Sequence, residues 1–257
     1  MTRRLAPLLI TFLATSGASA RQAAPTGQDV VRRIGLLPPG PGNPRNSEGA
    51  FLELTGGRLL FIYTHFTGGS ADHAASHLAS RFSDDGGKSW RKSRTELRPP
   101  PASRSGLQEP GVVELKDGRL LMLCRTDQGS QFRSYSADGG DTWSEARPTD
   151  LKSPLSPASV KRIPQTGDLL LVWNDHRGVA EKYKGKRTPF NLAISRDEGE
   201  TWEDVKVLED NPDGWYCYTA IAFDGDRVLL GHCAGDRQVG RLNRTQITSF
   251  PVAWLYR

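Results

Sequence analysis

The stretch Ser83-Asp84-Asp85-Gly86-Gly87-Lys88-Ser89-Trp90 decides the fold, because its pattern returns twice more along the chain. The second copy is Ser136-Ala137-Asp138-Gly139-Gly140-Asp141-Thr142-Trp143, and the third is Ser195-Arg196-Asp197-Glu198-Gly199-Glu200-Thr201-Trp202. The copies start 53 and 59 residues apart, and each has Ser, Asp, Gly and Trp at the same four places. Self-similarity of this kind indicates a repeat architecture.

The chemistry of the repeated pattern is that of a tight turn between strands. Asp and Ser side chains can bond the backbone of the turn, and Gly supplies a left-handed conformation. The Trp that follows can bury a large ring against the next repeat. Three such turns at matching places therefore predict a repeated β-unit.

The segments between the turns read as pairs of short strands around a Gly. No stretch has a sustained 3.6-residue period, so we expect almost no helix. The repeat predicts an all-β fold, a β-propeller of four-stranded antiparallel blades with about four blades. A strand around Val30–Leu37 and a closing strand at Pro251–Tyr256 are also expected, with Trp173 in the core and Trp254 between blades. The expected pairs are Glu48–Leu54 with Arg58–Tyr63, Gly111–Leu115 with Arg119–Leu123, Ser159–Ile163 with Asp168–Trp173, and Thr219–Phe223 with Arg227–Leu230.

The N-terminus has the composition of an export signal. A basic start at Arg3 and Arg4 precedes the short apolar run Leu5–Leu13 and the small residues Ala18-Ser19-Ala20. We expect residues 1–20 to be a signal peptide, 21–44 a tail with a closing strand, and 45–257 the propeller domain. The protein would then be exported, to a periplasm or outside the cell, with no membrane contact after signal removal.

Charge and cysteine usage narrow the functional classes. The formal charge of +5 falls to +3 without the two signal arginines, which is too small an excess to predict nucleic-acid binding. Cys124, Cys217 and Cys233 have no metal-ligand spacing, so no zinc site is expected. Cys217 and Cys233 lie on neighbouring predicted strands and could form a disulfide; three buried thiols are the alternative.

The three turns resemble the Asp-boxes, or BNR repeats, of the sialidase (neuraminidase) superfamily. In sialidases three Arg hold the substrate carboxylate, a Tyr is the nucleophile, a Glu is its base, and an Asp is the acid and base for the leaving group. Planar guanidinium groups suit a carboxylate, and a neutral phenol avoids repelling it. The resemblance implies an exo-α-sialidase that hydrolyses terminal sialic acid from glycans with retention of configuration, and that needs no metal and no cofactor.

The resemblance gives a residue for each of these roles. The stretch from Glu109 to Arg125 is similar to the superfamily's run from its Glu to its second Arg, and it leads into the second Asp-box. Glu109 would be the base and Arg125 a carboxylate ligand. Tyr218, followed by Asp224-Gly225, resembles the nucleophile segment, with Tyr216 as the rival, since both point the same way on a regular strand.

The remaining places follow in the superfamily's order. Arg187, just before the third Asp-box, resembles the third Arg, with Arg177 as the rival. Asp72 matches the acid and base, and Arg45 matches the first Arg, although Glu48 nearby offers it an ordinary ion-pair partner. His73, His176 and Asn174 could line the pocket and Asp175 could pair with Arg177, but ordinary loop polarity is the preferred interpretation for all four.

The chain departs from the resemblance in length. Sialidases of this type have six blades, and here only 37 residues separate Asp72 from Glu109, where the superfamily has at least one whole blade. Two other functions therefore remain open: a non-catalytic propeller that binds acidic glycans, and a hydrolase of another acidic sugar.

Overall fold

The computed structural model describes residues 37–257, which form four antiparallel sheets. Three sheets have four strands in simple meander order, and the fourth has three. The described helices are two 3₁₀ turns, Glu181–Tyr183 and Val252–Tyr256. The expected signal peptide and the strand around Val30–Leu37 lie almost entirely outside the described residues. No described helix has the length and apolar character needed to span a membrane.

Each sheet takes its strands consecutively from the chain, so each is one repeat. Their bounds are β1 Arg45–Glu53, β2 Leu59–Phe66, β3 Ser76–Ser83 and β4 Arg91–Lys92 in the first; β5 Gln108–Glu114, β6 Leu120–Arg125, β7 Ser130–Ser136 and β8 Arg147–Lys152 in the second; β9 Ser159–Arg162, β10 Leu169–Trp173, β11 Phe190–Ser195 and β12 Glu203–Glu209 in the third; and β13 Trp215–Asp224, β14 Arg227–Gly235 and β15 Thr245–Pro251 in the fourth.

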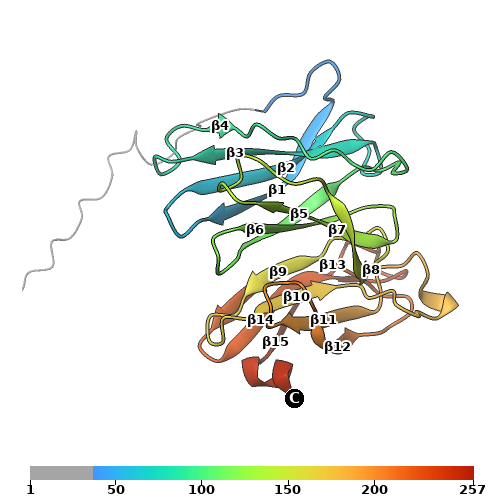
Figure 1. Cartoon of the computed structure of the whole chain (residues 1–257). Coiled ribbons are helices and arrows are strands. Elements are labelled where there is room, and N and C mark those ends of the chain that lie inside the picture. The colour runs from blue at the N-terminus through green and yellow to red at the C-terminus, as the bar shows by residue number, and fades with distance from the viewer. Residues whose placement is uncertain (1–36) are drawn as a thin grey trace, which may run out of the picture. The chain divides into compact units, whose positions relative to one another are not determined.

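The four sheets are the blades of a β-propeller, as the repeat predicted. The first strand of each blade lies nearest the centre: β5 contacts β1 on one side and β9 on the other, and β9 contacts β13. Figure 1 shows the blades following one another in chain order. The fourth blade, with β15 as its last described strand, is one strand short of the expected plan.

The middle strands explain why blades pack face to face. Leu120 and Met122 of β6 belong to the core shared with blade 1, whereas Leu121 and Leu123 belong to the core shared with blade 3. Side chains alternate between the two faces of a strand, so a strand buried on both faces must be apolar throughout. The expectation that Trp173 is a core residue is confirmed, since it is 1% exposed.

The Asp-box turns are held by side-chain bonds to their own backbone. In the second copy the hydroxyl of Ser136 accepts from the amide of Gly140 at 2.9 Å, and Asp138 accepts from the amide and hydroxyl of Thr142 at 2.8 and 2.6 Å. Gly140 has φ +90°, and a Cβ there would lie 2.6 Å from a methyl carbon of Leu60. The turn therefore requires its Gly, both for the backbone and for the close approach of blade 1.

Two local expectations are wrong. Pro251–Tyr256 is not a closing strand, because β15 ends at Pro251 and the chain continues as a 3₁₀ turn. Trp254 nevertheless lies between blades as expected, since it packs, partly buried, against the core shared by blades 3 and 4. The ring of Trp143 packs in the core shared with the preceding blade and not with the next one. All three cysteines are free thiols, so Cys217 and Cys233 do not form a disulfide. They do lie opposite each other on the neighbouring strands β13 and β14.

Candidate active site

The inner strands of blades 1, 2 and 4 each carry a β-bulge at a matching place. The register of β1 shifts between Ser47 and Ala50, that of β5 between Gln108 and Gly111, and that of β13 between Cys217 and Ala220. A non-glycine residue with positive φ occupies each bulge, and such strained positions gather at functional sites. These residues are Glu48 with φ 56°, Glu109 with φ 51° and Tyr218 with φ 55°.

Tyr218 and Glu109 meet although 109 residues separate them in sequence. The phenol hydroxyl of Tyr218 donates to Oε1 of Glu109 at 2.9 Å. Burial raises the pKa of Glu109 above the ordinary value for a Glu, while the positive charges of Arg125 and Arg187 oppose the rise. Burial also raises the pKa of Tyr218, and the charge of Glu109 adds to this. The pair therefore has a carboxylate placed to take the proton of a neutral phenol.

The bulge in β13 decides between the two tyrosines. Tyr216 is 5% exposed and stacks on Phe190 inside the core shared with blade 3, 5.8 Å between ring centroids. On a regular strand Tyr218 would face the same way, but its positive φ turns it towards Glu109, and the residue stays 43% exposed. The expectation that both tyrosines share a face is wrong, and the reason is the bulge.

Arg125 is buried next to the pair, on the last residue of β6. Its Nη1 lies 2.8 Å from Oε1 of Glu109, and its Nη2 donates to the side chain of Gln108 and, at 2.9 Å, to the carbonyl oxygen of Asp72. A buried charge needs a partner of opposite sign. Arg125 and Glu109 meet this need for each other, and Arg125 also ties the loop of Asp72 to the site.

Arg187 reaches the same place from the segment before β11. Its guanidinium carbon lies 5.1 Å from the ring centroid of Tyr218 and 5.7 Å from that of Trp215, so it packs over both rings. The residue is 9% exposed, and its Nε and Nη1 atoms are buried without a hydrogen-bond partner among residues 37–257. Arg187 thus brings a cation with unused donors to the phenol of Tyr218.

Arg45 and Asp72 face each other at the rim of the site. Nη1 of Arg45 donates to Oδ1 of Asp72 at 2.6 Å and to the carbonyl oxygen of Ser70 at 3.0 Å, and its Nη2 donates to Glu48 at 2.6 Å. The hydrogen bond from Arg45 lowers the pKa of Asp72 below the ordinary value for an Asp. The side chain of Asp72 is 77% exposed, so it borders solvent.

All six residues singled out from the sequence thus lie in one connected set of contacts, and their chemical roles remain predictions. Two of the other candidates have structural contacts: Asn174 donates to the carbonyl oxygen of Pro189, and a ring nitrogen of His176 bonds the carbonyl oxygen of Thr188. His73 is exposed. Arg177 does not contact the site and pairs instead with Asp175 at 2.9 Å, which was the alternative interpretation of Asp175.

A cavity of about 850 Å³ runs between the inner strands and is bordered by all three bulge residues. The sequence indicates Glu48 only as an ion-pair partner of Arg45, and it gives no sign of a role for Gln108. The signal that could have found Glu48 is its place in the repeat, since it lies in blade 1 where Glu109 lies in blade 2. No group of three or more His, Cys, Asp and Glu side chains among the described residues could hold a metal ion.

Fold and site define a propeller of the BNR type. Residues 43–231 match the family described as the BNR repeat-like domain, and the chain belongs to this family. The resemblance to the sialidase superfamily is confirmed by two relatives. The chain is 29% identical over 183 residues to a sialidase of Micromonospora viridifaciens, and this match covers 68% of the chain. It is 31% identical over 149 residues to a sialidase of Vibrio cholerae, and that match covers 49% of the chain.

Solved structures agree in fold. The NanB sialidase of Streptococcus pneumoniae superposes with a TM-score of 0.58 and 21% identity over 79% of this chain and 30% of its own. A leech intramolecular trans-sialidase, complexed with 2,7-anhydro-Neu5Ac, superposes with a TM-score of 0.60 and 20% identity over 80% of this chain and 31% of its own. The chain spans about a quarter of the Micromonospora relative and about a fifth of the Vibrio relative.

Proposed function

We propose that this protein is an exo-α-sialidase that hydrolyses terminal sialic acid from glycans with retention of configuration. The observation that carries the proposal is the 2.9 Å hydrogen bond from the phenol of Tyr218 to Glu109, next to the guanidinium groups of Arg125 and Arg187. A phenol with a carboxylate base is the arrangement needed to attack a carbon that itself bears a carboxylate. A charged nucleophile would be repelled by that anion.

The arginines would hold the sugar by its carboxylate. Arg187 has two buried donor nitrogens, Nε and Nη1, without partners among the described residues, so these two atoms can bind an anion without giving up a hydrogen bond. Arg45 and Arg125 would complete the cradle, and bidentate guanidinium contacts would fix the sugar's orientation. The anomeric carbon would then face the hydroxyl of Tyr218.

The chemical steps balance without a metal or cofactor. The phenol oxygen of Tyr218 bonds to the anomeric carbon as the glycosidic bond breaks, its proton passes to Glu109, and Asp72 gives a proton to the leaving oxygen. Water then gives a proton to Asp72 while its oxygen bonds to the anomeric carbon. The phenolate leaves and regains its proton from Glu109. Two displacements retain the configuration.

Asp72 constrains the order of events. An acid must carry a proton, and the bond from Arg45 keeps the pKa of Asp72 low in the free protein. A substrate carboxylate that binds Arg45 would weaken this bond and let the pKa of Asp72 rise. Substrate binding would therefore prepare the acid.

The same contact favours a second function. A non-catalytic propeller that binds acidic glycans would need the arginines but no proton donor, and Asp72 held by Arg45 at 2.6 Å is a poor donor. The two functions differ in one measurement.

The test measures the hydrolysis of a fluorogenic aryl sialoside and the binding of free N-acetylneuraminic acid on the same protein. We expect both, with binding lost in Arg187→Ala and kept in Arg177→Ala, the matched control whose guanidinium pairs with Asp175. Binding without hydrolysis would select the glycan-binding function. Binding unaffected by Arg187→Ala would contradict both.

A further inference from the structure

Glu48 lies in the one bulge of the three to which the proposed reaction gives no role. It has the same backbone conformation as Glu109 and Tyr218, with φ 56°. It also borders the same cavity as those two residues. A carboxylate in this strained conformation, at the position where two other blades present their reacting groups, indicates a role at the site.

The two oxygens of Glu48 have different surroundings. Oε1 accepts from Nη2 of Arg45 at 2.6 Å. Oε2 is buried and has no hydrogen-bond partner among the described residues. A carboxylate oxygen removed from water without a partner is costly, so Oε2 is suited to a donor that a ligand brings.

The charges around Glu48 indicate that it is more than a counter-ion of Arg45. Arg45 already has Asp72 as a second acidic partner at 2.6 Å, so it does not depend on Glu48 for neutralisation. Burial raises the pKa of Glu109, and the negative charge of Glu48 adds to that rise, which places the two carboxylates within electrostatic reach. Glu48 thus adds negative charge to a site that must bind an anion.

We propose that Glu48 is a specificity residue: Oε2 accepts a hydrogen bond from a hydroxyl or amide N–H of the bound acidic sugar, while Oε1 holds Arg45. The proposal rests on the proposed function and specifies its substrate class. A carboxylic acid ligand that carries hydrogen-bond donors is accepted. A carboxylate ligand without donors leaves Oε2 of Glu48 without a partner and is repelled by its negative charge, so it is rejected. A site that leaves a buried polar group unpaired discriminates strongly in this way.

The test compares two ligands, N-acetylneuraminic acid and benzoate, which has a carboxylate but no donor. Glu48→Gln keeps an oxygen for Arg45 and replaces the acceptor by an amide nitrogen. We expect the variant to lower the affinity for N-acetylneuraminic acid by at least about tenfold, because one hydrogen bond to a charged group is lost. Benzoate should bind several-fold more tightly, because a negative charge near it is gone. Calorimetric titration at pH 7 measures both.

The opposite signs make the outcome decisive. Weaker binding of both ligands would show that Glu48 only positions Arg45, and tighter binding of both would show only a change of net charge; either overturns the proposal. Glu114→Gln is the matched control, because Glu114 borders the same cavity at the other end of β5 and bonds Thr55 instead. It should change the affinity for each ligand by less than about twofold.

Equilibrium binding needs no turnover, so the test is separate from that of the proposed function. The expected pattern in a protein that hydrolyses no sialoside would overturn the enzyme and keep the specificity of Glu48. Wild-type protein that binds no N-acetylneuraminic acid would overturn both.

Discussion

The Asp-box turns and the inner-strand bulges are both repeated, but in different ways. The three Asp-boxes repeat in sequence as well as in structure: Ser, Asp and Gly make the same hydrogen bonds in each copy. The three bulges repeat only in backbone, since the residues at positive φ are Glu48, Glu109 and Tyr218. One region keeps its residues, whereas the other keeps its geometry and changes its chemistry.

This difference separates scaffold from site. A turn that closes each blade must solve one mechanical problem several times, and the same side chains solve it each time. A binding site made by several blades needs different groups at one centre. In a repeat protein, the functional residues are therefore to be sought at positions where the backbone conformation repeats but the side chains differ, such as the three bulges.

The largest expected effect is that of Tyr218→Phe. Removing the proposed nucleophile should lower turnover of an aryl sialoside by on the order of 10⁴-fold or more. The fold should persist, because Glu109 keeps its contact with Arg125 at 2.8 Å. Initial rates and the thermal midpoint, measured on the same preparation, check both parts.

The control for this variant is Tyr216→Phe, which removes a hydroxyl from a tyrosine two residues away in the core. It should leave turnover within a few-fold of wild type. Wild-type-like turnover in Tyr218→Phe would show that Tyr218 is not the nucleophile. It would also contradict the assignment of the bulges to the site and of the turns to the scaffold.

A smaller loss is expected for Glu109→Gln. Without the base, turnover should fall by about 10²–10³-fold, the usual contribution of proton transfer. In wild type the base must be ionised, and burial raises the pKa of Glu109, so kcat/KM should fall as the pH decreases through a value above 4.5. The variant should lose this acidic limb. A limb that persists in Glu109→Gln would assign the titration to another group.

The scaffold was predictable from sequence because its signals are local. Each Asp-box contains its own hydrogen-bonding partners within eight residues, so the pattern is visible without coordinates. The strands beside the turns were found for the same reason. The 3₁₀ turn at Val252–Tyr256 was missed because its apolar residues match the pattern of a strand equally well, and tertiary packing against the core decided between them.

The site was predictable only through the resemblance. The contact of Tyr218 with Glu109 spans 109 residues, and no local pattern indicates it. The bulges were not predicted either, because a positive φ at Glu or Tyr has no sequence signal of its own. For that reason alternation could not separate the two tyrosines of β13, and the sequence indicated for Glu48 only an ion pair with Arg45.

In the scaffold, Asp138→Ala should reduce stability and leave chemistry unchanged. The variant loses the bonds from the amide and hydroxyl of Thr142 and from the hydroxyl of Ser136. We expect the free energy of unfolding to fall by about 2–3 kcal/mol, as for hydrogen bonds to a charged group. Urea unfolding measures this, and kcat per folded molecule should stay that of wild type. A change in kcat without a change in stability would contradict the structural role of the turn.

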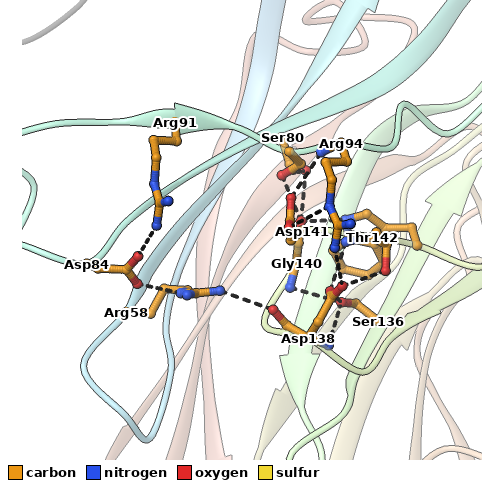
Figure 2. Close-up of polar contacts among 12 residues, drawn as sticks. Arg58, Ser80, Asp84, Arg91, Arg94, Ser136, Asp138, Gly140, Asp141 and Thr142 are labelled. Carbon is orange, nitrogen blue, oxygen red and sulfur yellow. Dashed lines mark hydrogen bonds and ion pairs between the residues drawn. The ribbon is translucent and has the colours of Figure 1, made fainter.

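The smallest effect is expected for Asp84→Asn, a residue of the first Asp-box that makes none of its turn-closing hydrogen bonds (Figure 2). Asp84 is exposed and pairs with Arg58 at 2.6 Å and with Arg91 at 2.5 Å. Arg58 keeps its bond to the carbonyl oxygen of Asp138 and its packing over Phe82 without this pair. Exposed ion pairs stabilise little and are screened by salt, so the urea midpoint should barely change, and any change should vanish in high salt. A loss as large as that of Asp138→Ala would show that exposed ion pairs within blade 1, and not only the turn's own hydrogen bonds, stabilise the scaffold.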